Sequence, residues 1–176
     1  SCFPKDVRAL IYSAEEHNQP LRIVKATMEV NEAQIKRFFG KIKNRFGNLN
    51  ALKFAIWGLA FKPNTDDVRE APAFKLIDML LADGATVNVH DPEALENTRR
   101  HYGDKLNYFN KMYDAIQDCD ALIVVTEWNQ FRTPDFNLIA SKLKNKIIFD
   151  GRNLYSLDNM SELGFEYYSI GRKDIR

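Results

Sequence analysis

Cysteine is scarce in this chain, since only Cys2 and Cys119 occur among 176 residues. Two cysteines are too few for the dense disulfide framework of a small secreted domain, so we expect a reducing compartment and a cytoplasmic protein. Long apolar runs are also missing, because no stretch reaches the roughly 18 residues that a membrane-spanning helix needs. The sequence therefore predicts neither a disulfide scaffold nor a membrane segment.

An excess of either charge is absent as well, because 25 Lys and Arg balance 24 Asp and Glu to leave a net charge of +1. Nonspecific nucleic-acid binding needs a strongly basic face, so we expect no nucleic-acid partner. The histidines, His17, His90 and His101, have no metal-ligand spacing with the cysteines, and we expect no metal site. With 45% hydrophobic residues, the chain can form one core and a helical extension.

Chemically active residues gather at the very start, where SCFPKD occupies positions 1–6. Cys2 is a candidate nucleophile, because Lys5 or a helix N-terminus could lower the pKa of its thiol. The competing interpretation is an inert hydrophobic residue, which a single cysteine usually is. A folded domain seldom begins on such a cluster, so the start resembles a cut through the active-site loop of a larger protein.

Two helices are predicted next, with different lengths. Residues 7–17 read as a short helix that Asp6 caps, and Asn18-Gln19-Pro20 ends it. Residues 21–46 keep helical spacing of apolar side chains and read as one helix. About 25 residues at ~1.5 Å each give a rod of ~37 Å, longer than a small domain can cover. Such a rod suits a bridge between domains or a subunit interface.

From residue 53 onward, strand patterns alternate with helix patterns. The expected strands are 53–58, 86–91, 106–109, 121–126, 146–151 and 165–171, and the expected helices are 71–84, 92–103, 111–119 and 135–143. This alternation predicts an α/β fold in which N-terminal helices, including one long central helix, precede a doubly wound, mostly parallel Rossmann-like sheet. Ligands of such sheets bind beyond the carboxyl ends of the strands, where the strand order reverses.

The loop after the first strand has too few glycines for a dinucleotide fingerprint, because Gly58 stands alone and G-x-G-x-x-G is absent. The loop instead carries Lys62, Thr65 and Arg69 ahead of a helix N-terminus, a place that favours anions. One interpretation is a phosphorylated ligand held by these side chains. The other, equally open, is a solvated loop in which the cations pair with neighbouring acids.

Three further polar groups follow the later strands. Asp91 could bind a ribose hydroxyl, but capping the next helix is the better interpretation of its spacing. Glu127 could anchor a loop, and Arg152 could clamp a phosphate or carboxylate with two hydrogen bonds. For Trp128 and Phe131 we expect hydrophobic packing.

These motifs resemble one family along nearly the whole chain. SCFPKD, a long helix with VNEAQ, GLAFKPNTDDVREAPA, VHDP, TEWNQF and DGRN occur in the order typical of the UDP-glucose 6-dehydrogenase family of nucleotide-sugar dehydrogenases. The resemblance implies NAD as cofactor and UDP-glucose as substrate, with SCFPKD, EAPA and TEWNQF favouring UDP-glucose over GDP-mannose or N-acetylated sugars.

The resemblance also implies a division of labour along the chain. Residues 1–50 would form the catalytic-Cys loop with central, dimerising helices, and residues 51–176 a UDP-binding Rossmann-like domain. The N-terminal NAD-binding domain of the family would be missing, so we expect the chain alone to be inactive and to form a homodimer through the long helix. The alternative is a free-standing nucleotide-sugar-binding or dimerisation module without catalysis.

Site residues follow from the resemblance in the same way. It implies that Cys2 attacks an aldehyde formed at C6 of the sugar, giving a thiohemiacetal and then a thioester, which water hydrolyses with help from Asp6. The remaining implied contacts are Phe3, Lys62 and Arg152 to the UDP-sugar, and Lys5 and Arg69 to NAD.

Overall fold

The computed structural model describes residues 2–176, with side chains from Lys5 onward. Its elements are α1 (Cys2–Glu16), α2 (Arg22–Phe46), β1 (Lys53–Trp57), α3 (Pro72–Ala82), β2 (Thr86–His90), α4 (Leu95–Tyr102), a short 3₁₀ turn (Gly103–Lys105), β3 (Asn107–Tyr108), α5 (Met112–Ala115), β4 (Ala121–Val124), α6 (Asn129–Arg132), α7 (Phe136–Lys142), β5 (Ile147–Asp150), α8 (Leu157–Glu162) and β6 (Glu166–Ser169). The side chains of Cys2 and Phe3, two predicted site residues, lie outside the described part.

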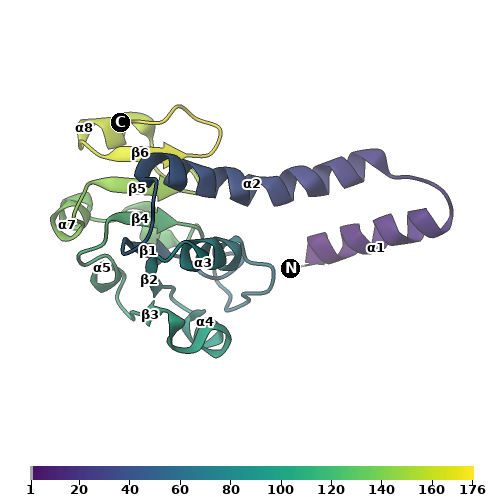
Figure 1. Ribbon diagram of the computed structural model, residues 1–176, viewed down its shortest axis with the longest axis horizontal. Helices are drawn as coiled ribbons and strands as arrows, with labels where there is room; N and C mark the ends of the chain where they lie inside the picture. Colours follow the sequence, from purple (N-terminus) through teal and green to yellow (C-terminus); the bar gives the residue numbers. More distant parts are fainter. Residues whose placement is uncertain (1) are drawn as a thin grey trace.

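The first two helices form a hairpin that projects from the α/β body, here called the arm (Figure 1). The predicted cap at Asp6 is wrong, because α1 already begins at Cys2 and Asp6 lies inside it. The same result replaces the expected active-site loop with helix. Pro4 is compatible with this early start, because a proline in the first helical turn gives up no hydrogen bond.

Helix α2 runs over 25 residues, as its apolar spacing predicts. Its C-terminal half is held on the sheet by aromatic side chains: Phe38 meets Phe149 edge-to-face at 6.5 Å and Phe46 meets Phe54 at 5.4 Å. The helix ends at Gly47, whose φ of 70° suits a residue without Cβ. The N-terminal half has only α1 beside it and extends the arm away from the body (Figure 1).

Six strands form one sheet in the order β3-β2-β1-β4-β5-β6, and every neighbouring pair is parallel. Helices α2, α3 and α4 lie on one face, and α5, α7 and α8 lie on the other (Figure 1). The predicted doubly wound α/β fold is confirmed. The strand order reverses between β1 and β4, so the loops after these two strands mark the expected ligand edge.

Some short elements differ from the sequence prediction. Helix α4 begins at Leu95 rather than at residue 92, because the carboxylate of Asp91 turns the chain first by accepting the Glu93 and Ala94 N–H groups at 2.9 and 2.8 Å. Helices α6 and α8 were not predicted, since four and six residues are too few for a helical period to be visible. Among residues 2–176, no helix is both long and apolar enough to cross a bilayer.

Candidate functional site at the carboxyl edge of the sheet

The loops after β1 and β4 touch directly at the point where the strand order reverses. Gly58 has a φ of 94°, and a Cβ built there would lie 2.5 Å from the Cβ of Thr126. The hydroxyl of Thr126 donates to the Ala60 carbonyl at 2.6 Å across the same contact. The lone glycine of this loop therefore allows close packing between two loops.

The buried carboxylate of Asp91 joins the loops at this edge through hydrogen bonds. Its side chain is 1% exposed, and its two oxygens accept hydrogen bonds from the backbone N–H groups of Leu59, Ala60, Glu93 and Ala94 and from the indole of Trp128. The predicted helix cap is wrong in detail, because α4 begins at Leu95 with Ala94 as its N-cap, and Asp91 instead holds the turn that precedes the helix. With five donors, the carboxylate is fully occupied by the protein itself, so the ribose-binding alternative is unsupported.

Asp150 plays the corresponding part at the end of β5. Its fully buried carboxylate accepts from the Arg152 N–H at 2.8 Å, the Leu154 N–H at 2.6 Å and the Tyr167 hydroxyl at 2.7 Å. The loop that carries Arg152 is therefore fixed through its backbone. Sequence reasoning did not assign this role to Asp150, although an acid that ends a fully apolar strand is a usable signal.

The Arg152 side chain reaches the next loop and donates from Nε to the carboxylate of Glu127. Burial alone would raise the pKa of Glu127, but the hydrogen bond and charge of Arg152 outweigh burial and hold that pKa below its usual range. The predicted anchoring role of Glu127 is thereby explained. The Arg152 side chain remains 37% exposed at the edge.

The loop after β1 presents its two predicted cations differently. Lys62 is exposed, and its ammonium makes no hydrogen bond or ion pair with any residue in the described part of the chain. Arg69 instead holds Asp67 through two contacts of 2.9 Å, and this hydrogen bonding is the main reason why the pKa of Asp67 lies far below its usual value. Local pairing of cations, one of the two interpretations of the loop, therefore applies to Arg69.

Aromatic residues form the floor of the edge. Trp128 and Phe131 are buried, as predicted, and the ring of Phe131 stacks on Trp57 at 5.2 Å. The His90 ring contacts the Phe109 carbonyl at 2.9 Å through Nδ1, and burial lowers the pKa of this imidazole. We therefore interpret His90 as a neutral, structurally packed side chain and not as a cation that could bind a ligand.

The two cysteines lie in different parts of the fold. Cys119 is buried beside β2, where desolvation raises the pKa of its thiol to about 12. It is therefore an inert thiol. Cys2 stands at the first residue of α1, and the nearby Lys5 and Asp6 form an exposed ion pair of 3.8 Å. Among the side chains that the structure describes, from Lys5 onward, no group of His, Cys, Asp and Glu could hold a metal ion.

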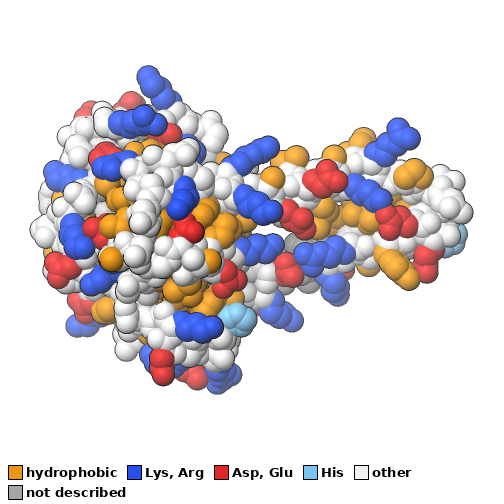
Figure 2. Space-filling view, viewed as in Figure 1, with side chains coloured by type: hydrophobic (Ala, Val, Ile, Leu, Met, Phe, Trp, Pro, Cys, Tyr) orange, Lys and Arg blue, Asp and Glu red, His pale blue; other side chains and the backbone are white. Residues whose placement is uncertain are grey.

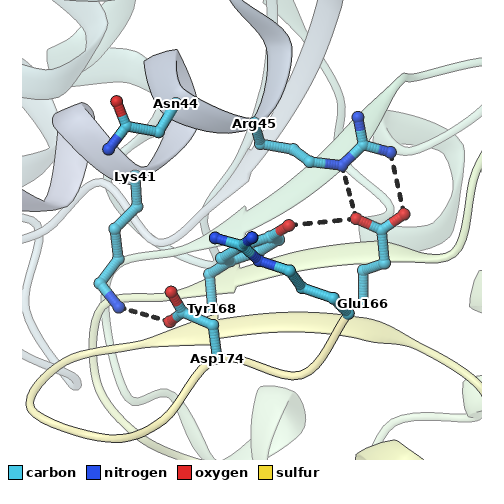
Figure 3. A pocket seen from close by; sticks show the side chains of 7 residues that line it. Lys41, Asn44, Arg45, Glu166, Tyr168 and Asp174 are labelled. Atoms are coloured by element: carbon cyan, nitrogen blue, oxygen red, sulfur yellow. Dashed lines mark hydrogen bonds and ion pairs between the residues drawn. The ribbon is translucent and has the colours of Figure 1, made fainter.

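A separate hollow of about 300 Å³ lies between α2 and β6 (Figure 3). Four of its charged side chains form two ion pairs, Arg45 with Glu166 at 2.5 and 2.8 Å and Lys41 with Asp174 at 2.5 Å, and Arg176 also lines the hollow. These pairs join α2 to β6 through Glu166 and to the segment after β6 through Asp174.

Comparison with known proteins matches this chain along its length. Residues 55–157 fit the family model "UDP-glucose/GDP-mannose dehydrogenase family, UDP binding domain", and residues 1–33 fit the "central domain" of the same family. The UDP-glucose 6-dehydrogenase of Pseudomonas aeruginosa is 44% identical over 98% of this chain and 39% of its own length. The corresponding enzyme of Rhizobium meliloti is 42% identical over 99% of this chain and 40% of its own length.

Solved structures give the same result. A UDP-glucose dehydrogenase from Pyrobaculum islandicum superposes with a TM-score of 0.82 at 34% identity, covering 96% of this chain and 36% of that protein. The chain thus spans less than half the length of each of these relatives.

Proposed function

Because the chain belongs to the UDP-glucose/GDP-mannose dehydrogenase family, we propose that it forms the UDP-binding and central parts of an NAD-dependent UDP-glucose 6-dehydrogenase. The observation that carries the proposal is the match of residues 55–157 to a UDP-binding domain whose cations lie at the carboxyl edge of a doubly wound sheet. The proposed boundary between the arm with its catalytic start and the UDP-binding domain lies at residues 50 and 51. The proposed location is the cytoplasm.

In this proposal, Lys62 and Arg152 bind the diphosphate of the UDP-sugar. Lys62 has an uncommitted ammonium, and Arg152 keeps guanidinium N–H groups for a phosphate while Nε stays on Glu127. Both side chains project from loops that the carboxylates of Asp91 and Asp150 fix. A fixed backbone lowers the entropy lost when a ligand is bound. Phe3 would line the sugar at the start of α1.

The proposed chemistry uses the start of α1. Oxidation of an alcohol to a carboxylate releases two hydrides, which NAD bound by the complete enzyme would accept. The thiolate of Cys2 adds to the aldehyde carbon of the first product, and the resulting thiohemiacetal loses the second hydride to become a thioester. Asp6 takes a proton from the water that cleaves the thioester, which releases the carboxylate and the thiol.

The described residues include cations that could bind NAD, but they include no glycine-rich loop of the kind that binds a dinucleotide. Lys5 and Arg69 are 80% and 81% exposed, and cations of this kind fit a pyrophosphate. The sequence has no G-x-G-x-x-G, so the rest of the NAD site would belong to an N-terminal domain outside this chain. We therefore expect no NADH production by this chain alone.

The first test is the affinity for UDP. With only one wall of the site present, we expect a dissociation constant on the order of millimolar, or about −4 kcal/mol. Removing a charged donor in Lys62→Ala or Arg152→Ala should weaken binding roughly tenfold or more, because such hydrogen bonds contribute ~1.5–3 kcal/mol. Calorimetric or NMR titration measures this, with Lys105→Ala, an exposed lysine before β3, as control. Equal affinities for all four proteins, or tighter binding of NAD than of UDP, would contradict the assignment.

We also propose that the arm pairs two copies of the chain. Part of the apolar face of α2 is covered by this chain itself, since Phe38 and Ile42 are buried on the sheet. Other apolar side chains on the arm remain in solvent: Leu10 at 55%, Tyr12 at 66%, Ile23 at 83% and Val30 at 55% exposed. Figure 2 shows apolar side chains at the surface of the arm. Such a surface favours association. Light scattering at micromolar concentration should give the mass of a dimer, and Ile23→Glu should give the mass of a monomer.

A further inference from the structure

An ion pair joins the arm to the loop between β1 and α3. Arg8 of α1 donates to Glu70 through two parallel hydrogen bonds, Nη1–Oε1 of 3.3 Å and Nη2–Oε2 of 3.2 Å. The partners are 62 residues apart in sequence, and the N-terminus of α1 lies beside the loop that leads into α3 (Figure 1). The two-pronged geometry restricts direction as well as distance.

The Arg8–Glu70 ion pair contributes little to the stability of the fold. The Arg8 and Glu70 side chains are 49% and 40% exposed, and a solvent-exposed ion pair adds little to the free energy of folding. The same contact is still the main cause of a raised pKa for Arg8 and a lowered pKa for Glu70, so both groups stay charged around neutral pH.

The backbone at Glu70 gives an independent sign of a role for its side chain. Its φ of 58° is left-handed, and it is the third residue of a turn that the Ala71 N–H closes onto the Val68 carbonyl at 3.1 Å. Glycine or asparagine is usual where a turn needs positive φ at this position. A glutamate held in a strained conformation points to a function for the carboxylate that offsets the cost.

The position of the Arg8–Glu70 pair in the fold indicates what the carboxylate does. Arg8 lies two residues beyond Asp6 on a continuous helix that starts at Cys2, and six residues of helix span only ~9 Å. Glu70 directly follows Arg69 in the loop that also carries Lys62. Fixing Arg8 on Glu70 therefore sets where the first turn of α1 sits relative to the edge.

We propose that Arg8 and Glu70 are positioning residues. Their ion pair fixes the N-terminal end of α1 relative to the loop after β1, which carries Lys62 and Glu70. That this position matters for catalysis rests on the function proposed above, whereas the position of α1 itself does not. Lys75 on α3 approaches Glu70 at 3.8 Å, on the body rather than on the arm. Its removal should leave α1 in place, which makes Lys75→Ala the matched control.

The test is a distance measurement by pulsed EPR on the chain itself. One nitroxide is attached to the thiol of Cys2 and a second to Ala82→Cys at the end of α3, while buried Cys119 stays unlabelled. We expect one narrow distance peak in the reference protein and in Lys75→Ala. Arg8→Ala and Glu70→Ala should lose the narrow peak, and the reversed pair Arg8→Glu with Glu70→Arg should restore it.

Glu70→Gly separates positioning from folding. It removes the strain at positive φ, so the thermal midpoint should not fall, yet the narrow peak should be lost with the carboxylate. A narrow peak that survives in Arg8→Ala and Glu70→Ala, or one that Lys75→Ala abolishes equally, would overturn the proposal. All distances are recorded without nucleotide, so absent UDP binding would defeat the proposed function and leave this result unaffected.

Discussion

Replacing Asp91 by alanine should lower the free energy of unfolding by about 3–5 kcal/mol, because several buried N–H groups lose their acceptor at ~1–3 kcal/mol each. The carboxylate is 1% exposed and ties together the loops after β1, β2 and β4 through Leu59, Ala60, Ala94 and Trp128.

Urea denaturation followed by tryptophan fluorescence measures this loss. Asp91→Asn should fall between alanine and the unmodified protein, since an amide keeps one acceptor oxygen but turns an NH₂ group toward the same donors. Asp104→Ala, at an exposed acid, is the control and should change the free energy of unfolding little. An Asp91→Ala protein as stable as this control would show that the carboxylate does not hold the edge together.

Gly58→Ala should destabilise the protein by about 3 kcal/mol, from a clash and an unfavourable backbone together. The added methyl group would stand 2.5 Å from both the backbone nitrogen and the Cβ of Thr126, where no flexible side chain can give way. The φ of 94° is also one that alanine avoids.

Gly40→Ala is the matched control, with an expected effect of opposite sign. Gly40 lies inside α2, and its added Cβ would meet nothing within 4 Å. Alanine there should stabilise the helix by about 1 kcal/mol. Thermal or urea unfolding of the two variants, side by side, measures both effects. If both alanines are tolerated equally, the loops after β1 and β4 are not packed as closely as the structure has them.

The fold was predictable because its strongest signals are local. Alternating strands and helices from residue 53, and the apolar spacing of residues 21–46, suffice for the α/β class and for α2. Helix boundaries depended on contacts that sequence spacing does not reveal. The delayed start of α4 comes from the Asp91 carboxylate, and the early start of α1 leaves Asp6 within the helix rather than at its end.

The site was predictable only in part. The positions of Lys62, Glu127 and Arg152 beyond strand ends follow from the topology, but the choice of partners does not. Arg69 is engaged by Asp67 two residues away, and Glu70 by Arg8 across the arm. Long-range pairs of this kind depend on how the helices pack, which a linear pattern leaves undetermined.

The binding position of UDP is the measurement that tests this account most directly. Backbone amide NMR shifts recorded during a UDP titration of the chain should change in the loops after β1, β4 and β5, around Lys62, Glu127 and Arg152, which the sheet brings to one edge. Shifts confined to the hollow between α2 and β6, around Arg45 and Glu166, would place the nucleotide elsewhere and contradict a UDP site at the carboxyl edge.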